Sequence, residues 1–181
     1  MASLDRVPSA DAGKAMLMSA FDPKRTFIEG SMETGVAQID HAFRDVPKRP
    51  SITLRAGNAL DGYESPPDFD PAVDGVSPEY FETYFWGISY LDPQSWLFYL
   101  PHFLKCALAC RNDGRSNLVN AFLGSLRPPD RNPPRFGLLT AEQEQAVVAV
   151  LDELAFSSES MWRDEAMSAL EEYWAPGATY R

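Results

Sequence analysis

The 181-residue chain contains few of the residues from which compact functional motifs are built. It has two cysteines and two histidines. A phosphate-binding glycine loop, a nucleophile elbow, an HExxH helix and a redox CxxC pair are all missing from the sequence. The common nucleotide-binding, hydrolase, metalloprotease and dithiol classes are therefore not indicated, whereas rarer enzyme classes stay open.

The two cysteines do not indicate a disulfide framework. Cys106 and Cys110 lie four residues apart on one predicted helix, where the roughly parallel Cβ vectors do not suit a bridge. A reducing cytoplasm is the simplest expected location. The longest apolar stretch, about 96–110, is interrupted by Pro101, His102 and Lys105, so we expect no membrane span.

Basic residues are missing from one long segment. Residues 56–104 contain no lysine or arginine, yet they hold eight carboxylates and 12 of the 22 aromatic rings. The whole chain carries a formal charge of −10, which repels phosphate backbones and argues against nucleic-acid and anionic-membrane binding. Residues 105–135 differ, with six basic and two acidic side chains.

The chain shows helical periodicity from residue 32 onward. Ser77-Pro78 and Asp92-Pro93 are typical helix starts, and Thr140 with Gln143 matches a capping box. Apolar spacing then predicts helices over about 33–45, 77–86, 93–111, 116–126, 140–155 and 158–174. Pro101 predicts a kink or a break in the third of these.

These patterns predict a mainly α protein, a compact single-domain bundle of about six helices around a buried central helix at about 93–111. At most one short strand is expected near 51–55, followed by a loop over 57–75. The helical domain is expected over 32–175, with a C-terminal tail over 176–181. Residues 1–31 lack periodicity, and Met18–Thr26 resembles a leader found before unrelated bacterial proteins, so we expect a disordered or non-native N-terminal tail.

Two groups of residues are candidates for function. The first is an acidic and aromatic surface that would bind a partner, formed by Asp61, Tyr63, Glu64, Asp68, Asp70, Asp74, Tyr84 and Trp86. The second is a pocket near Pro101 lined by Tyr99, His102 and Cys106.

No catalytic residue, metal or cofactor is indicated by these patterns. His102, Cys106 and Cys110 recur every four residues, so on a straight helix the outer two lie about 12 Å apart and cannot reach one ion. A Cys–His nucleophile also needs an electropositive setting, whereas the neighbouring segment supplies carboxylates.

Several runs of residues resemble an uncharacterised bacterial family that is known only as a domain of unknown function. The main one is Leu91–Leu104, which contains a tyrosine-leucine-proline-x-x-leucine signature, and Arg135–Gln143 and Ala169–Trp174 resemble its closing helices. The likeness covers about residues 33–174. It implies a small bacterial cytosolic protein and carries no activity with it.

The leading hypothesis is a non-enzymatic interaction protein that binds a basic protein partner. Small acidic helical proteins often act as immunity partners of secreted toxins, and this analogy suggests a toxin-immunity role. The alternative is a small enzyme or ligand-binding protein with its pocket near Pro101. A third hypothesis is a homodimer in which the basic segment 105–135 meets the acidic segment 56–104 of its mate.

Overall fold

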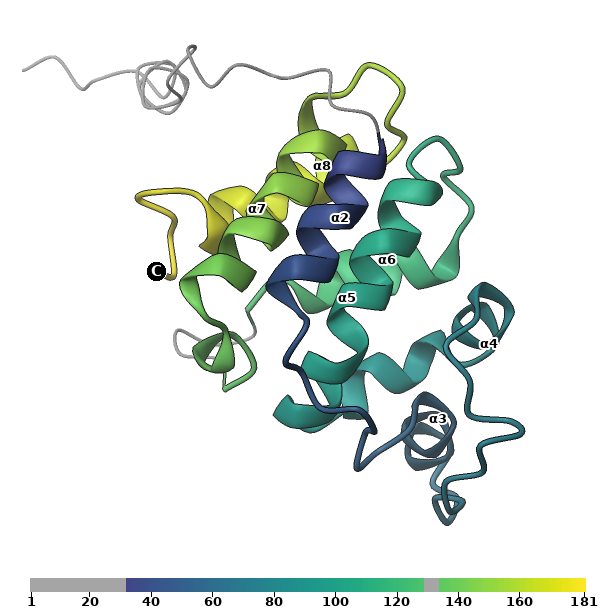
Figure 1. The fold of residues 1–181 in the computed structure, drawn as a ribbon. Helices are drawn as coiled ribbons and strands as arrows, with labels where there is room; N and C mark the ends of the chain where they lie inside the picture. Colours follow the sequence, from purple (N-terminus) through teal and green to yellow (C-terminus); the bar gives the residue numbers. More distant parts are fainter. Residues whose placement is uncertain (1–31, 129–133) are drawn as a thin grey trace, which may run out of the picture. The chain divides into compact units, whose positions relative to one another are not determined.

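The computed structural model describes residues 32–128 and 134–181, and the predicted tail over 1–31 lies outside them. Seven α-helices are described (Figure 1): α2 (Met32–Ala42), α3 (Leu54–Asp61), α4 (Pro78–Thr83), α5 (Pro93–Ala109), α6 (Asn117–Ser125), α7 (Ala141–Phe156) and α8 (Arg163–Ala169). Short helical turns η1 (Phe85–Tyr90), η2 (Phe136–Leu138) and η3 (Leu170–Trp174) accompany them. The described residues contain no strand, and the predicted mainly α fold is confirmed.

The short strand that the sequence allowed near 51–55 is absent, because this segment leads into a helix. Thr53 has an extended backbone, with φ −77° and ψ 161°, but it is the N-cap of α3. Its hydroxyl accepts the N–H of Ala56 at 3.0 Å. The first five residues of the loop predicted over 57–75 likewise belong to α3, which ends at Asp61.

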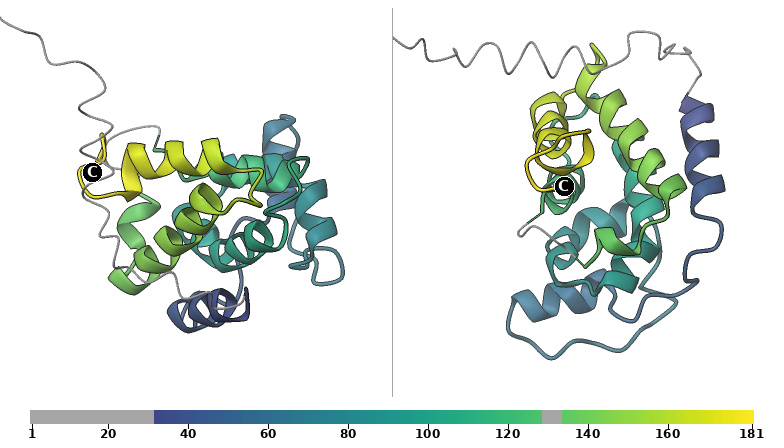
Figure 2. Two further views of the ribbon diagram at one scale, coloured as in Figure 1. Left: turned by 90° about the horizontal axis from the view of Figure 1, so that it is seen from above. Right: turned by 90° about the vertical axis from the view of Figure 1, so that its left-hand side faces the viewer.

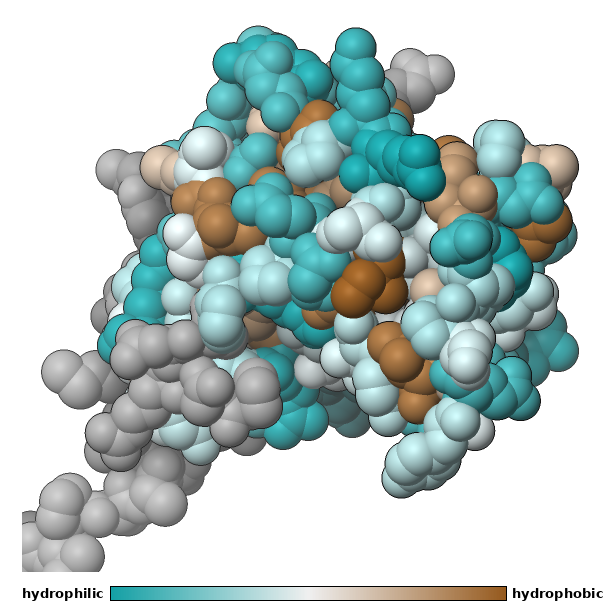
Figure 3. Space-filling view, turned by 90° about the horizontal axis from the view of Figure 1, so that it is seen from below, coloured by the Kyte–Doolittle hydropathy of each residue, from teal (hydrophilic) through white to brown (hydrophobic). Residues whose placement is uncertain are grey.

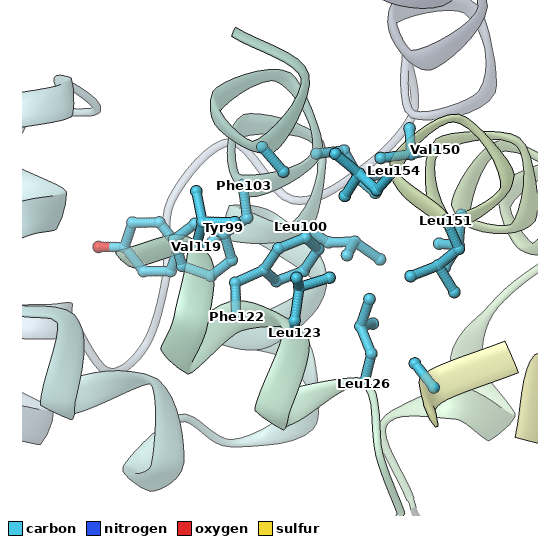
Figure 4. Close-up of a cluster of buried hydrophobic side chains, with 14 of the residues drawn as sticks. Tyr99, Leu100, Phe103, Val119, Phe122, Leu123, Leu126, Val150, Leu151 and Leu154 are labelled. Carbon is cyan, nitrogen blue, oxygen red and sulfur yellow. The ribbon is translucent and has the colours of Figure 1, made fainter. Parts of the chain in front are cut away.

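The predicted central helix is confirmed as α5, which is buried along most of its length. Pro101 is buried inside α5 and does not end it, so the helix runs from Pro93 to Ala109 without a break. Figure 4 shows Leu100 and Phe103 of α5 meeting Phe122 and Leu123 of α6. Residues of α7, among them Val150, Leu151 and Leu154, complete this core.

Helix α2 lies on the outside of α5 and α7 (Figure 2). It buries Ile39 and Ala42, and Phe43 directly after the helix is also buried. Charged residues bracket this contact, because Lys105 of α5 binds Asp40 and Arg44 lies 3.4 Å from Glu142 of α7. Such exposed pairs contribute little, so the apolar contact holds most of this helix in place.

A carboxylate joins α4 to the start of α6. Glu82 accepts hydrogen bonds from the Ser116 hydroxyl and from the N–H groups of Asn117, at 3.1 Å, and Leu118, at 3.4 Å. These N–H groups belong to the first turn of α6. The N–H groups in the first turn of a helix have no acceptor within that helix. Glu82 therefore caps α6 from another element and fixes α4 against it.

Candidate functional site

Large apolar side chains are exposed mainly in one part of the described structure. Six of the ten lie between residues 60 and 90: Leu60, Tyr63, Val73, Val76, Trp86 and Tyr90. Tyr63 is 99% exposed, Trp86 59% and Tyr90 41%. Together with the exposed acids of the same segment, these side chains form what we call the acidic aromatic surface, comprising the exposed side chains of residues 60–90.

Apolar residues do not form one continuous area on the face of the molecule shown in Figure 3. The face shown in Figure 3 has separate apolar patches surrounded by hydrophilic residues. A surface of mixed character is typical of an interface that forms and dissociates, in which aromatic anchors are surrounded by polar groups. The acidic aromatic surface has the same mixed composition.

Most of the residues predicted to bind a partner lie on this surface, and two do not. Six are exposed: Asp61, Tyr63, Glu64, Asp68, Asp70 and Trp86. Tyr84 is half-buried and packs against Tyr80, with ring centroids 5.0 Å apart. The side chain of Asp74 has no exposed area, so it cannot contact a partner directly.

Asp74 instead clamps the loop after α3 to the helix itself. Its Oδ1 accepts from Arg55 Nε at 3.0 Å and from the Tyr80 hydroxyl at 3.0 Å. Its Oδ2 accepts from Arg55 Nη2 at 2.8 Å and from the N–H of Asp70 at 2.8 Å. Four hydrogen bonds saturate the carboxylate, which is the condition for burying a charge at tolerable cost.

Hydrogen bonds and burial shift the pKa values of Asp74 and of the neighbouring tyrosines. Burial acts to raise the pKa of Asp74, but the hydrogen bonds from Arg55, Asp70 and Tyr80 outweigh it, and the pKa lies below the ordinary aspartate value. Burial raises the pKa of Tyr80 and, more strongly, that of Tyr99. The carboxylate is therefore charged and both phenols are neutral at pH 7.

Tyr90 belongs to the acidic aromatic surface, although no pattern in the sequence indicates it. Its hydroxyl donates to Asp61 Oδ1 at 2.9 Å, which joins η1 to the end of α3. This hydrogen bond is the main cause of a raised pKa at Tyr90. No periodicity signals such a contact, because it depends on how two short elements are placed beside each other.

A half-buried arginine holds the segment that carries Trp86 and Tyr90. Arg135 Nη2 donates to the carbonyl oxygens of Ile88 at 3.1 Å, Ser89 at 3.1 Å and Leu91 at 2.6 Å. Burial lowers the pKa of Arg135 below its ordinary value. The contact satisfies carbonyls at the end of η1 and fixes the orientation of this part of the surface.

The three residues of the predicted pocket, Tyr99, His102 and Cys106, have surroundings that differ from one another. Tyr99 is in the core, stacked on Phe103 with centroids 5.6 Å apart, and its hydroxyl points away from the apolar cluster (Figure 4). Burial lowers the pKa of His102, helped by nearby Lys105. Burial also raises the pKa of Cys106 to about 11.

These shifts leave a neutral imidazole and a protonated thiol at pH 7, a combination that disfavours a nucleophilic cysteine. His102 and Cys106 lie one turn apart on α5, whereas the Tyr99 hydroxyl lies beside that of Tyr80. Within 32–128 and 134–181, no three histidine, cysteine, aspartate or glutamate side chains are grouped to hold a metal ion.

The basic residues of 105–135 that the structure describes are engaged within the chain. Lys105 binds Asp40, Arg111 lies 3.0 Å from Glu159, and Arg127 binds Glu172. Arg115 lies 3.2 Å from Asp113, and Arg135 binds backbone carbonyls. These pairs compete with any contact between this segment and the acidic segment of a second copy.

Fold and surface together define an all-helical protein with an exposed acidic aromatic surface. No helix in the described part of the chain is long and apolar enough to cross a membrane. The chain belongs to the family of unknown function DUF6714, whose model matches residues 33–178. This match confirms the resemblance to a family of unknown function. No curated protein and no solved structure matches the chain.

Proposed function

We propose that this chain is a non-enzymatic interaction protein whose acidic aromatic surface binds a basic protein. The observation that carries the proposal is the exposure of Tyr63, Trp86 and Tyr90 within a segment rich in carboxylates. Arg55, a basic residue in the first turn of α3, is held by Asp74 and does not neutralise the exposed acids. The surface therefore presents negative charge and aromatic area together.

The two kinds of side chain have different roles in such a complex. Exposed carboxylates such as Glu64 and Asp68 attract a basic protein over a distance and speed its association, an effect that salt screens. Aromatic side chains such as Trp86 lose their contact with water in the complex and supply most of the binding energy. Rapid, salt-sensitive association with aromatic anchors is the expected behaviour.

A different protein fits this surface better than a second copy of the chain. The engaged bases of 105–135, in particular Lys105, Arg111 and Arg127, would have to leave their own carboxylates to pair with a mate. A toxin whose basic active face is masked is the narrower form of the proposal, and it rests on analogy with other small acidic helical proteins.

The test is capture of a partner by the immobilised full-length chain from a lysate of its own source at low salt. The eluate obtained with high salt is then identified by mass spectrometry, and the association rate of the captured protein is measured. We expect one stoichiometric, basic protein that salt releases. Its identity as a toxin would support the immunity role.

Two matched double variants separate the acidic aromatic surface from the overall negative charge. Glu64→Lys with Asp68→Lys reverses two exposed acids of the surface, whereas Asp164→Lys with Glu171→Lys reverses two exposed acids on α8 and η3. Both change the net charge equally. The first should slow association at least several-fold and the second much less. Equal rates for the two variants would contradict the proposal.

A further inference from the structure

The half-buried ring of Phe69 lies in the same segment as the acidic aromatic surface, and the backbone that carries it is held in place. The carbonyl oxygen of Asp68 accepts from Arg55 Nη2 at 2.9 Å, and the N–H of Asp70 donates to Asp74 Oδ2 at 2.8 Å. The backbone on each side of Phe69 is therefore tied to the Arg55–Asp74 clamp. Asp68 and Asp70 themselves are exposed, so the half-buried ring lies between two carboxylates in the sequence.

A guanidinium group of the chain already lies on this ring. The Cζ atom of Arg49 is 4.1 Å from the centroid of Phe69, well within the range of a cation–π contact. Arg49 is exposed, and among the described residues it forms no ion pair. The contact with the ring is thus open to exchange with another cation.

We infer that Phe69, with Asp68 and Asp70 beside it, is a recognition position for an arginine side chain of the basic partner, and that Arg49 occupies this position in the free protein. The inference rests on the proposed function and names the chemistry that the surface selects. Arginine fits better than lysine because its planar guanidinium stacks on a ring and donates to flanking carboxylates at the same time.

The test compares two peptides of equal charge, nine arginines and nine lysines, by titration calorimetry against the full-length protein. The arginine peptide should bind about two- to fivefold more tightly, the size of one exposed cation–π contact. Phe69→Leu removes the ring and keeps an apolar side chain, and this variant should lose the preference for arginine. Its circular dichroism should match that of the wild type.

Removing Arg49 from the Phe69 ring should increase the affinity for the arginine peptide. Arg49→Ala frees the ring, whereas Lys48→Ala removes the same charge from the neighbouring exposed position. Affinity for the arginine peptide should rise about two- to fivefold more in Arg49→Ala than in Lys48→Ala. Equal gains in the two variants would show that Arg49 does not compete for the site.

The outcomes separate this inference from the proposed function. If the wild type binds both peptides equally, or if Phe69→Leu keeps the preference, recognition of arginine at Phe69 is overturned while binding of basic proteins stands. If neither peptide binds at low salt, both proposals fail.

Discussion

Gly57 of α3 and Gly87 of η1 meet backbone to backbone. A Cβ atom added at Gly57 would lie 2.5 Å from the carbonyl oxygen of Gly87, and one added at Gly87 would lie 2.1 Å from that of Leu54. Both contacts are too short for any side chain, and the atoms in the way belong to the backbone. The two glycines therefore permit α3 and η1 to approach each other, and this approach places Asp61 beside Tyr90.

Gly87→Ala should destabilise the protein by about 1–3 kcal/mol or more, because the backbone must move to admit the methyl group. The control is Gly124→Ala in α6, where a Cβ atom meets nothing within 4 Å. That substitution should stabilise the helix by up to about 1 kcal/mol. Chemical denaturation of the two variants measures both effects, and a neutral Gly87→Ala would contradict the close approach.

Asp74→Asn should cost about 2–3 kcal/mol at pH 7, because it weakens charged hydrogen bonds and leaves the partly buried Arg55 without its counter-ion. The cost should depend on pH. The pKa of Asp74 is lowered by folding, so its contribution is complete above the pKa of an unfolded aspartate, about 3.9. It is lost as the pH falls through the lower pKa of the folded state.

The measurement is the difference in unfolding free energy between wild type and Asp74→Asn at several pH values. The difference should be constant from pH 7 to about 5 and should shrink below about pH 4. A difference of the same size at pH 3 and pH 7 would mean that the charge of Asp74 does not contribute.

Cys106 should react slowly with thiol reagents, because its pKa of about 11 leaves little thiolate. At pH 8 about one molecule in a thousand would be ionised there, against about a quarter for an ordinary cysteine. Alkylation of the Cys110→Ser variant, in which Cys106 is the remaining thiol, should accelerate up to about pH 11. A rate that levels off near pH 8.5 would refute the effect of burial.

Glu82→Ala should destabilise the protein by about 1–2 kcal/mol, because it removes the carboxylate that caps the first turn of α6. Glu79→Ala is the matched control, since Glu79 is an exposed acid on the same helix. Urea denaturation compares the two. Equal losses would indicate that Glu82 acts only through its charge on α4.

The helix starts that have local signals could be predicted from the sequence. Ser77 accepts from the N–H of Tyr80, Asp92 accepts from those of Gln94 and Ser95, and Thr140 forms the expected capping box with Gln143. In each case the capping side chain and the N–H group that donates to it lie within three residues of each other. Such contacts are visible in the sequence because they do not depend on the rest of the fold.

The features that were missed depend on contacts between distant residues. The last helix was expected from about Ser158 but begins at Arg163, and the preceding Met161 donates its N–H to the carbonyl of Arg111 at 2.8 Å. Helix α3 contains Gly57, a poor helix former that is needed for the approach of η1. The sequence does not distinguish Asp74 from a surface acid, because its partner, Arg55, precedes it by 19 residues.

The contact between Arg135 and the carbonyls of Ile88, Ser89 and Leu91 affects the order in which the protein folds during translation. A chain leaving the ribosome presents Trp86 and Tyr90 before Arg135 has emerged from the exit tunnel, because Arg135 lies further along the sequence. Until then the end of η1 lacks the donor that fixes it, and the aromatic rings are exposed on an unanchored segment. The surface is thus finished only after Arg135 has emerged, and the growing chain is most open to premature association between the emergence of Tyr90 and that of Arg135.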